Sequence, residues 1–133
     1  MKKIVPFCKA ADASIRYRAA ELLCWGTAAE GQAALVALLC DDDRKVRFCA
    51  AESLASVLGV ARTAAALENA LVSHPAIEDT VVEFVDCLPW MGSTRAVAAA
   101  LQTFAKHPCA AVAAAANQAQ LEVVRLSRRS ARA

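Results

Sequence analysis

The amino-acid sequence predicts an all-α protein built from stacked pairs of helices. Alanine supplies 33 of the 133 residues, against 4 glycines and 4 prolines, and this balance favours helix at nearly every position. The chain also repeats a helical pattern at an offset of 31 residues. A fixed period of this length indicates stacked structural units rather than a single globule.

The clearest copies of the repeat are residues 12–23 and 43–54, which align without a gap. In both copies an Asp, a β-branched residue, an Arg, an Ala-Ala pair, a Glu and a Leu recur in register. Residues 74–85 form a third copy, which keeps the apolar positions but replaces Asp by His and Arg by Glu. A fourth copy is fainter and places Val112 at the β-branched position. Apolar segments lie between the copies, so each period holds two helices.

Several residues predict where these helices begin and end. Gly26, Gly59 and Gly92 recur after the first helix of each pair, where a left-handed helix terminator is common. Pro89 ends the first helix of the third copy early. The predicted helix starts are the N-caps Asp12 and Asp43, the capping box from Thr27 to Glu30, and the first-turn prolines Pro75 and Pro108.

The pattern Asp-x-x-(Ile or Val)-Arg-x-x-Ala-Ala-Glu-x-Leu resembles the first helix of a HEAT-like repeat, of the short bacterial kind also seen in phycobiliprotein lyases. The resemblance spans roughly residues 12 to 124 and implies a right-handed α-solenoid of antiparallel helix pairs, with about 3.5 HEAT-like repeats. First helices would lie on the convex side and second helices on the concave side.

The resemblance also implies a ladder of Asp and Arg side chains between successive repeats. Asp12, Arg16, Asp43 and Arg47 keep this structural repeat ladder. The third copy departs from it, and we expect Glu78 to accept a hydrogen bond from Arg47 instead.

Charge divides the chain into a body and a tail. Residues 1–124 carry eleven basic and thirteen acidic side chains, and the last nine residues add four arginines. We expect one domain over residues 1–124, with residues 1–11 as an N-terminal cap, and a disordered basic tail over residues 125–133. The longest uncharged run, residues 107–121, is too short and too polar to span a bilayer.

The residues that carry chemistry do not assemble into a recognisable catalytic or metal site. The six cysteines contain no Cys-x-x-Cys pair, and we interpret them as reduced. His74 and His107 each precede a proline at an equivalent repeat boundary, which indicates a capping or turn role. No spacing brings a thiol and an imidazole together with an orienting third group, and no four ligands converge for zinc. We therefore expect no enzyme activity, no metal and no cofactor.

Two other features have a structural and a binding interpretation. Trp25 and Trp90 fall at the ends of first helices, and we favour core or inter-repeat packing over exposed binding anchors. Asp79, Glu83 and Asp86 share one face of the third copy's first helix and form a candidate acidic patch. A solvated helix face is the favoured interpretation of that patch, and recruitment of a basic partner is the alternative.

The second helices would supply a shallow groove able to accept a helix or an extended segment. Its candidate residues are small or polar and point away from the apolar face: Glu30, Ala33, Ala37, Arg62, Asn69, Arg95, Gln102 and Lys106.

These observations predict a cytoplasmic, non-catalytic scaffold, adaptor or inhibitor that binds another protein, in the manner of an immunity or regulatory protein. One alternative is a HEAT-like DNA-binding or base-excision protein, which the mildly acidic body disfavours. Another is a bilin-lyase-like enzyme or chaperone. No membrane partner is expected. A homodimer through an end repeat would use the stretch from Ala113 to Ala116.

Overall fold

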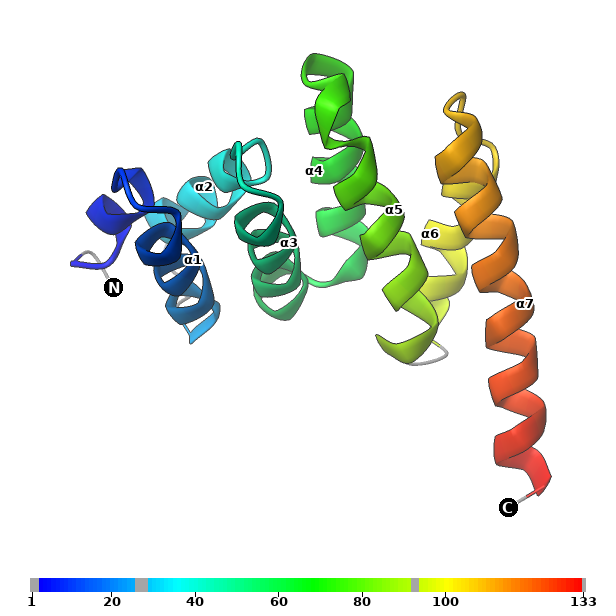
Figure 1. The fold of residues 1–133 in the computed structure, drawn as a ribbon. Coiled ribbons are helices and arrows are strands. Elements are labelled where there is room, and N and C mark those ends of the chain that lie inside the picture. The colour runs from blue at the N-terminus through cyan, green and yellow to red at the C-terminus, as the bar shows by residue number, and fades with distance from the viewer. Residues whose placement is uncertain (1–2, 26–28, 92–93, 133) are drawn as a thin grey trace. The chain divides into compact units, whose positions relative to one another are not determined.

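A computed structural model describes residues 3–25, 29–91 and 94–132 of the chain (Figure 1). Within these residues the protein is all-α, with seven α-helices and four short 3₁₀ helices and without strands. The chain divides into two compact units, Met1–Thr80 and Val81–Ala133, and the boundary falls inside a helix. The sequence predicts one domain over residues 1–124 instead. The two differ because each repeat of a helical stack contacts only its neighbours, so a single core need not span the chain.

The first unit contains two complete helix pairs. Its elements are η1 (Val5–Lys9), α1 (Ala13–Leu22), η2 (Leu23–Trp25), α2 (Ala29–Leu38), α3 (Arg44–Leu58), α4 (Val60–Ser73), η3 (Pro75–Ile77) and the start of α5 (Glu78–Cys87). Helices α1 and α3 lie side by side, and α3 also contacts α2 and α4 (Figure 1). The N-terminal segment forms η1, which packs on α1 and α2.

The second unit contains the rest of α5, followed by one helix pair. Its elements are η4 (Leu88–Met91), α6 (Arg95–Ala105) and α7 (Ala110–Arg132). Helices α6 and α7 pack against each other, and η4 contacts both of them. Phe84 and Phe104 are fully buried and supply the largest side chains of the core.

The observed helix boundaries confirm most of the predicted start and stop signals. The Asp12 carboxylate accepts from the Ser14 amide, and the Asp43 carboxylate accepts from the amides of Lys45 and Val46. Gly59 adopts a positive φ of 87° between α3 and α4, with a ψ of 169° that is extended rather than left-handed helical. Helix α5 ends at Cys87, two residues before Pro89. Gly26, Thr27 and Gly92 lie outside the described residues.

The basic tail is helical, which corrects the prediction of a disordered segment from residue 125. Helix α7 continues without a break to Arg132. Extending an existing helix requires no new nucleation, so each added residue needs little stabilisation of its own. Arg125 also bonds to Glu122 one turn earlier, and basic side chains are favoured near a helix C-terminus.

Candidate functional site

An arginine ladder joins the helix pairs of the first unit. Arg16 bonds to both carboxylate oxygens of Asp41, at 2.9 and 3.1 Å, and donates to the carbonyls of Ala10 and Ala11. The Asp41 carboxylate raises the pKa of Arg16. Charge-assisted, two-pronged contacts of this kind fix the orientation of both partners. The ladder predicted for Arg16 therefore exists, but its acid is Asp41.

Arg47 repeats this arrangement one helix pair later. It donates to the carbonyls of Asp41 and Asp42 ahead of α3, to the Thr80 hydroxyl at 2.8 Å and to both carboxylate oxygens of Asp79 at 3.2 Å. The prediction that Glu78 accepts from Arg47 is wrong. The 3₁₀ turn of η3 precedes α5, and its tighter winding rotates the following side chains away from an α-helical register.

Asp12 and Asp43 cap their own helices and are not the acids of the ladder. Hydrogen bonds from the Ser14 hydroxyl and amide lower the pKa of Asp12, since they favour its charged form. The predicted ladder of Asp12, Arg16, Asp43 and Arg47 therefore separates into two capping residues and two inter-repeat arginines.

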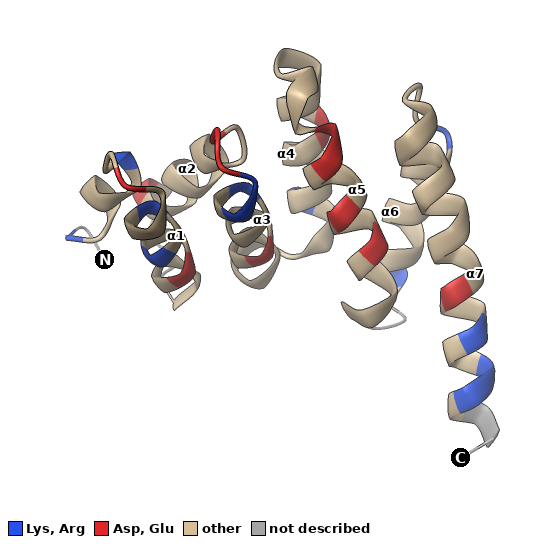
Figure 2. Ribbon diagram, in the orientation of Figure 1, with Lys and Arg blue, Asp and Glu red and all other residues tan. Residues whose placement is uncertain are grey.

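The candidate acidic patch lies along α5, where Figure 2 shows the acidic residues in red. Asp79 is shared by Arg47 and the more exposed Arg44, so one carboxylate of the patch is already paired. Partial desolvation, with the nearby Glu83 carboxylate, raises the pKa of Asp86. The patch is less negative than the sequence predicts, because the fold brings two arginines to it from α3.

The candidate groove residues on the second helices are all exposed. Five of them belong to α2 and α4 of the first unit: Glu30, Ala33, Ala37, Arg62 and Asn69. Three belong to α6 and its C-cap in the second unit: Arg95, Gln102 and Lys106. On α4, Leu67 and Leu71 face the core, as the sequence predicts. These surfaces are accessible, and their use in binding stays a prediction.

Both tryptophans are exposed, which overturns the prediction that they fill the core. Trp25 ends η2 and is 83% exposed, and Trp90 lies in η4 and is 67% exposed. The alanine-rich interior obtains its volume from leucine and phenylalanine instead. Sequence reasoning missed this because each tryptophan follows the last turn of an α-helix, where periodicity no longer indicates which side faces the core.

The fold brings a thiol and an imidazole together, a pair that the spacing in the sequence does not reveal. Cys40 Sγ lies 3.3 Å from Nδ1 of His74, although 34 residues separate them. Burial raises the pKa of the Cys40 thiol, which opposes formation of the thiolate that a nucleophile requires. His74 makes no side-chain cap to η3, whereas His107 Nδ1 accepts from the Cys109 amide and confirms its predicted capping role.

None of the six cysteines forms a disulfide. Cys49 is the most strongly perturbed, because burial and the nearby carboxylates of Glu21 and Glu52 raise its pKa to about 11. Over residues 3–25, 29–91 and 94–132, no group of three or more His, Cys, Asp or Glu side chains is placed to hold a metal ion. None of the helices in those ranges combines the length and the hydropathy that a membrane crossing requires.

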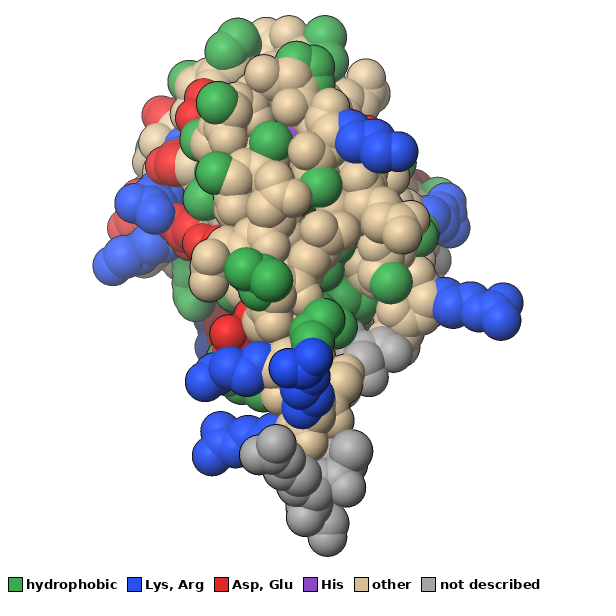
Figure 3. All heavy atoms as spheres, turned by 90° about the vertical axis from the view of Figure 1, so that its right-hand side faces the viewer, with side chains coloured by type: hydrophobic (Ala, Val, Ile, Leu, Met, Phe, Trp, Pro, Cys, Tyr) green, Lys and Arg blue, Asp and Glu red, His purple; other side chains and the backbone are tan. Residues whose placement is uncertain are grey.

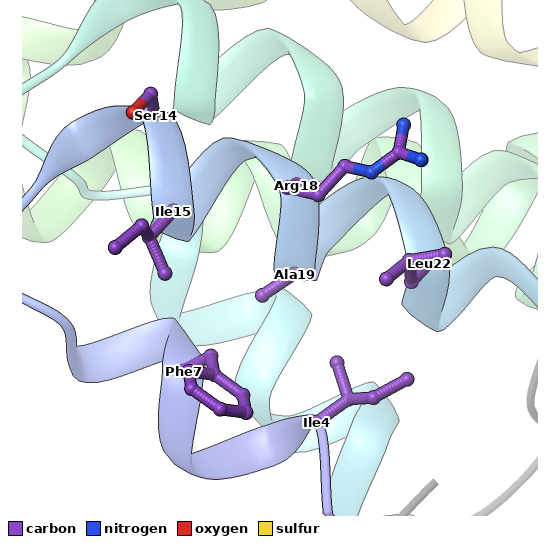
Figure 4. Close-up of a pocket in the computed structure, with 7 residues that line it drawn as sticks. All are labelled: Ile4, Phe7, Ser14, Ile15, Arg18, Ala19 and Leu22. Atoms are coloured by element: carbon purple, nitrogen blue, oxygen red, sulfur yellow. The ribbon is translucent and has the colours of Figure 1, made fainter.

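An apolar cavity of about 280 Å³ opens between η1 and α1. In Figure 4, Ile15, Ala19 and Leu22 follow one side of α1, and Phe7 and Ile4 lie across from them. Phe7 is 55% exposed, so the N-terminal segment covers α1 only in part. The predicted cap is present as η1, but it leaves apolar surface open at this end.

The last helix also exposes apolar side chains. Leu121 is 66% and Val124 is 49% exposed on α7, and Arg125, Arg128 and Arg129 continue along the same side. Figure 3 looks onto this helix and shows the basic side chains gathered near its C-terminal end. Ala115 and Ala116 are buried, so the predicted dimer stretch from Ala113 to Ala116 is not itself an open surface.

A family model described as HEAT repeats matches residues 1–83, which cover α1 to the middle of α5. No curated protein and no solved structure matches the chain.

Proposed function

Because the chain belongs to the HEAT-repeat family, we propose that it is a non-catalytic protein-binding module that acts as an adaptor, regulator or inhibitor. HEAT repeats generally serve as scaffolds for protein interactions. The observation that carries the proposal is the exposure of Trp25 and Trp90. Tryptophan is strongly enriched among the residues that dominate binding energy at protein interfaces.

The use of the buried polar side chains supports a non-catalytic role. In the described part of the chain these are Arg47, Ser53, Thr63 and Thr80. Ser53 donates to the Ala20 carbonyl, Thr63 donates to the Gly59 carbonyl, and Arg47 donates to the Thr80 hydroxyl. Each of these bonds joins backbone or side chains within the helical framework, so the polar chemistry of the interior serves packing.

Charge and cysteine content support a protein partner in the cytoplasm. The body of the chain is mildly acidic, whereas most of the affinity for nucleic acid comes from basic side chains that neutralise phosphates. Six free thiols are typical of a reducing compartment.

The proposal is tested by affinity capture from the native host, with quantitative mass spectrometry of the proteins retained. We expect one protein to be retained by the wild type and lost with Trp25→Ala or Trp90→Ala. Its purified form should bind the wild type directly in calorimetry, and each substitution should weaken the dissociation constant by about 10-fold or more.

Val72→Ala is the matched control. Val72 lies on α4 and is 82% exposed, so its truncation also removes an exposed apolar side chain without touching either tryptophan. The control should leave binding unchanged. Retention of every captured protein at wild-type levels by both tryptophan variants would contradict the proposal.

A further inference from the structure

Four positions recur on one side of every first helix, and we call this side the leading face. In α3, in η3 with α5, and in α7, all of its residues are buried, with at most 9% exposure. They are Val46, Cys49, Ala50 and Ser53; Ile77, Thr80, Val81 and Phe84; and Val112, Ala115, Ala116 and Ala119. The equivalent residues of α1 are Ile15, Arg18, Ala19 and Leu22. Only Ala19 is buried among these four.

The contact between α1 and α3 shows what a leading face binds. Ser53 Oγ donates to the Ala20 carbonyl at 2.8 Å, and Cys49 Sγ donates to the Tyr17 carbonyl at 3.7 Å. The leading face of α3 therefore lies against the opposite side of α1, which we call the trailing face. Ala20 is central to the trailing face and is fully buried. A small residue there allows the two helix backbones to approach closely.

The leading face of α1 has no such partner in the described chain. Ile15 is 44% and Leu22 is 37% exposed, and together with Ile4 and Phe7 they line the apolar cavity of Figure 4. Helix α1 therefore presents an aliphatic surface of the kind that the later repeats bury.

The trailing face of α7 is open in the complementary way. Ala51 of α3, the equivalent of Ala20, is fully buried, whereas the corresponding Asn117 of α7 is exposed. Leu121 and Val124 continue the same face at helical spacing, and both are exposed. Helix α7 thus exposes one half of the contact that α1 and α3 form, and α1 exposes the other half.

We propose that the protein associates head to tail, with the leading face of α1 in one copy receiving the trailing face of α7 in a second copy. A second copy is the expected occupant because this contact continues the interface that α1 and α3 already form. Arg18 of α1 is paired with Glu21 at 2.8 Å, and Arg125 of α7 is paired with Glu122, so these two charges are partly compensated within their own helices. The proposal uses neither tryptophan and is independent of the proposed partner protein.

A head-to-tail contact has a different symmetry from an ordinary dimer. Each copy uses two different surfaces, so association produces open chains or a ring rather than a pair that is sealed by one twofold axis. This asymmetry makes the proposal testable by complementation, because each surface can be blocked separately.

The test measures the oligomeric state by analytical ultracentrifugation over a range of concentrations up to about 1 mM. We expect the wild type to associate with rising concentration, and Ile15→Glu and Leu121→Glu each to remain monomeric alone. Mixing the two variants leaves one intact pair of faces, so the mixture should form 1:1 dimers and nothing larger. Val72→Glu, at a more exposed apolar position on α4, is the control and should associate as the wild type does.

Circular dichroism should report the same helix content for all variants, since the substituted side chains are solvent-exposed. A wild type that stays monomeric up to about 1 mM overturns the proposal. So does a mixture of the two variants that forms no dimer. Association that Ile15→Glu abolishes and Leu121→Glu leaves intact also overturns it, because that result indicates a twofold dimer through α1. Loss of association in Val72→Glu would place the interface on α4 and would likewise refute it.

Discussion

The guanidinium of Arg47 contacts both carboxylate oxygens of Asp79 at 3.2 Å, although 32 residues separate the two in the chain. The side chain of Arg47 is 10% exposed, while that of Asp79 is 41% exposed. The arginine also bonds to two backbone carbonyls before its own helix and to the Thr80 hydroxyl. Arg47 thus connects the second helix pair to the start of α5.

We expect Arg47→Ala to lower the free energy of unfolding by about 2 to 4 kcal/mol, because it leaves carbonyl and hydroxyl groups without their donor in a largely dry site. Urea denaturation followed by circular dichroism measures the change. Arg44→Ala is the control, since Arg44 reaches the same carboxylate from a position that is 60% exposed. Its removal should cost at most about 1 kcal/mol. Equal losses from the two substitutions would contradict the role given to Arg47.

Asp79, and not its neighbour Glu78, is the acid that stabilises this contact. Asp79→Asn should lower the free energy of unfolding by about 1 kcal/mol, because it removes the charge from the bonds to Arg47. Glu78→Gln should change it by less than about 0.5 kcal/mol. A double-mutant cycle of Arg47→Ala with Asp79→Asn should give a favourable coupling energy, and a cycle with Glu78→Gln should give none. A larger coupling energy with Glu78 than with Asp79 would identify Glu78 as the partner of Arg47.

Asp43→Ala should destabilise the protein by about 1 kcal/mol, because the carboxylate accepts from two amides that have no partner inside α3. Asp43→Asn should retain most of the stability, since the asparagine oxygen caps equally well. The adjacent Asp42→Ala serves as a control, since Asp42 is exposed and contributes to Arg47 only through its backbone carbonyl. Thermal unfolding measures the stability of the three variants. A loss of stability in Asp42→Ala as large as that in Asp43→Ala would argue against capping by Asp43.

Gly59→Ala should cost about 1 to 3 kcal/mol even though no atom lies within 4 Å of the added methyl group. The cause is the φ of 87°, which side chains other than glycine rarely adopt. Gly31→Ala is the comparison. Gly31 lies in the helix α2, and its added carbon would meet only the end of the Leu23 side chain at 3.3 Å. Gly31→Ala should change the free energy of unfolding by less than about 1 kcal/mol. A greater loss at Gly31 than at Gly59 would show that space, and not backbone conformation, limits substitution.

The raised pKa of Cys49 predicts a loss of stability in alkali. The folded thiol keeps its proton up to a pKa of about 11, whereas the thiol of the unfolded chain titrates near 9.0. The unfolded state therefore binds fewer protons between pH 9 and pH 11, and the free energy of unfolding declines as the pH rises through this window. Below pH 9 the thiol is protonated in both states, so the free energy of unfolding does not yet decline through Cys49.

Urea denaturation at pH values from 8 to about 11 measures this decline. Cys49→Ser removes the titrating group and offers a hydroxyl to the Tyr17 carbonyl, as Ser53 does to Ala20 one turn later. Its stability should fall less steeply over the same window. If the free energy of unfolding declines equally with pH in wild type and variant, Cys49 does not contribute to the decline.

Local interactions determine most of the features that the sequence predicts correctly. The N-caps at Asp12 and Asp43 and the end of α5 before Pro89 depend on residues within one turn of each other. The helical spacing of Val81, Phe84 and Val85 places them on one side of α5, and all three are buried. The same repeat pattern predicts the helix pairs and carries the resemblance to HEAT repeats.

Only the tertiary structure decided which side chains meet and which remain exposed. The ladder acids are Asp41 and Asp79, Cys40 lies beside His74, and both tryptophans are exposed to solvent. The two ladder contacts and the contact of Cys40 with His74 each join residues 25 or more positions apart in the chain. A repeat pattern specifies the same face for every copy, but whether that face is buried depends on whether another helix is present to cover it.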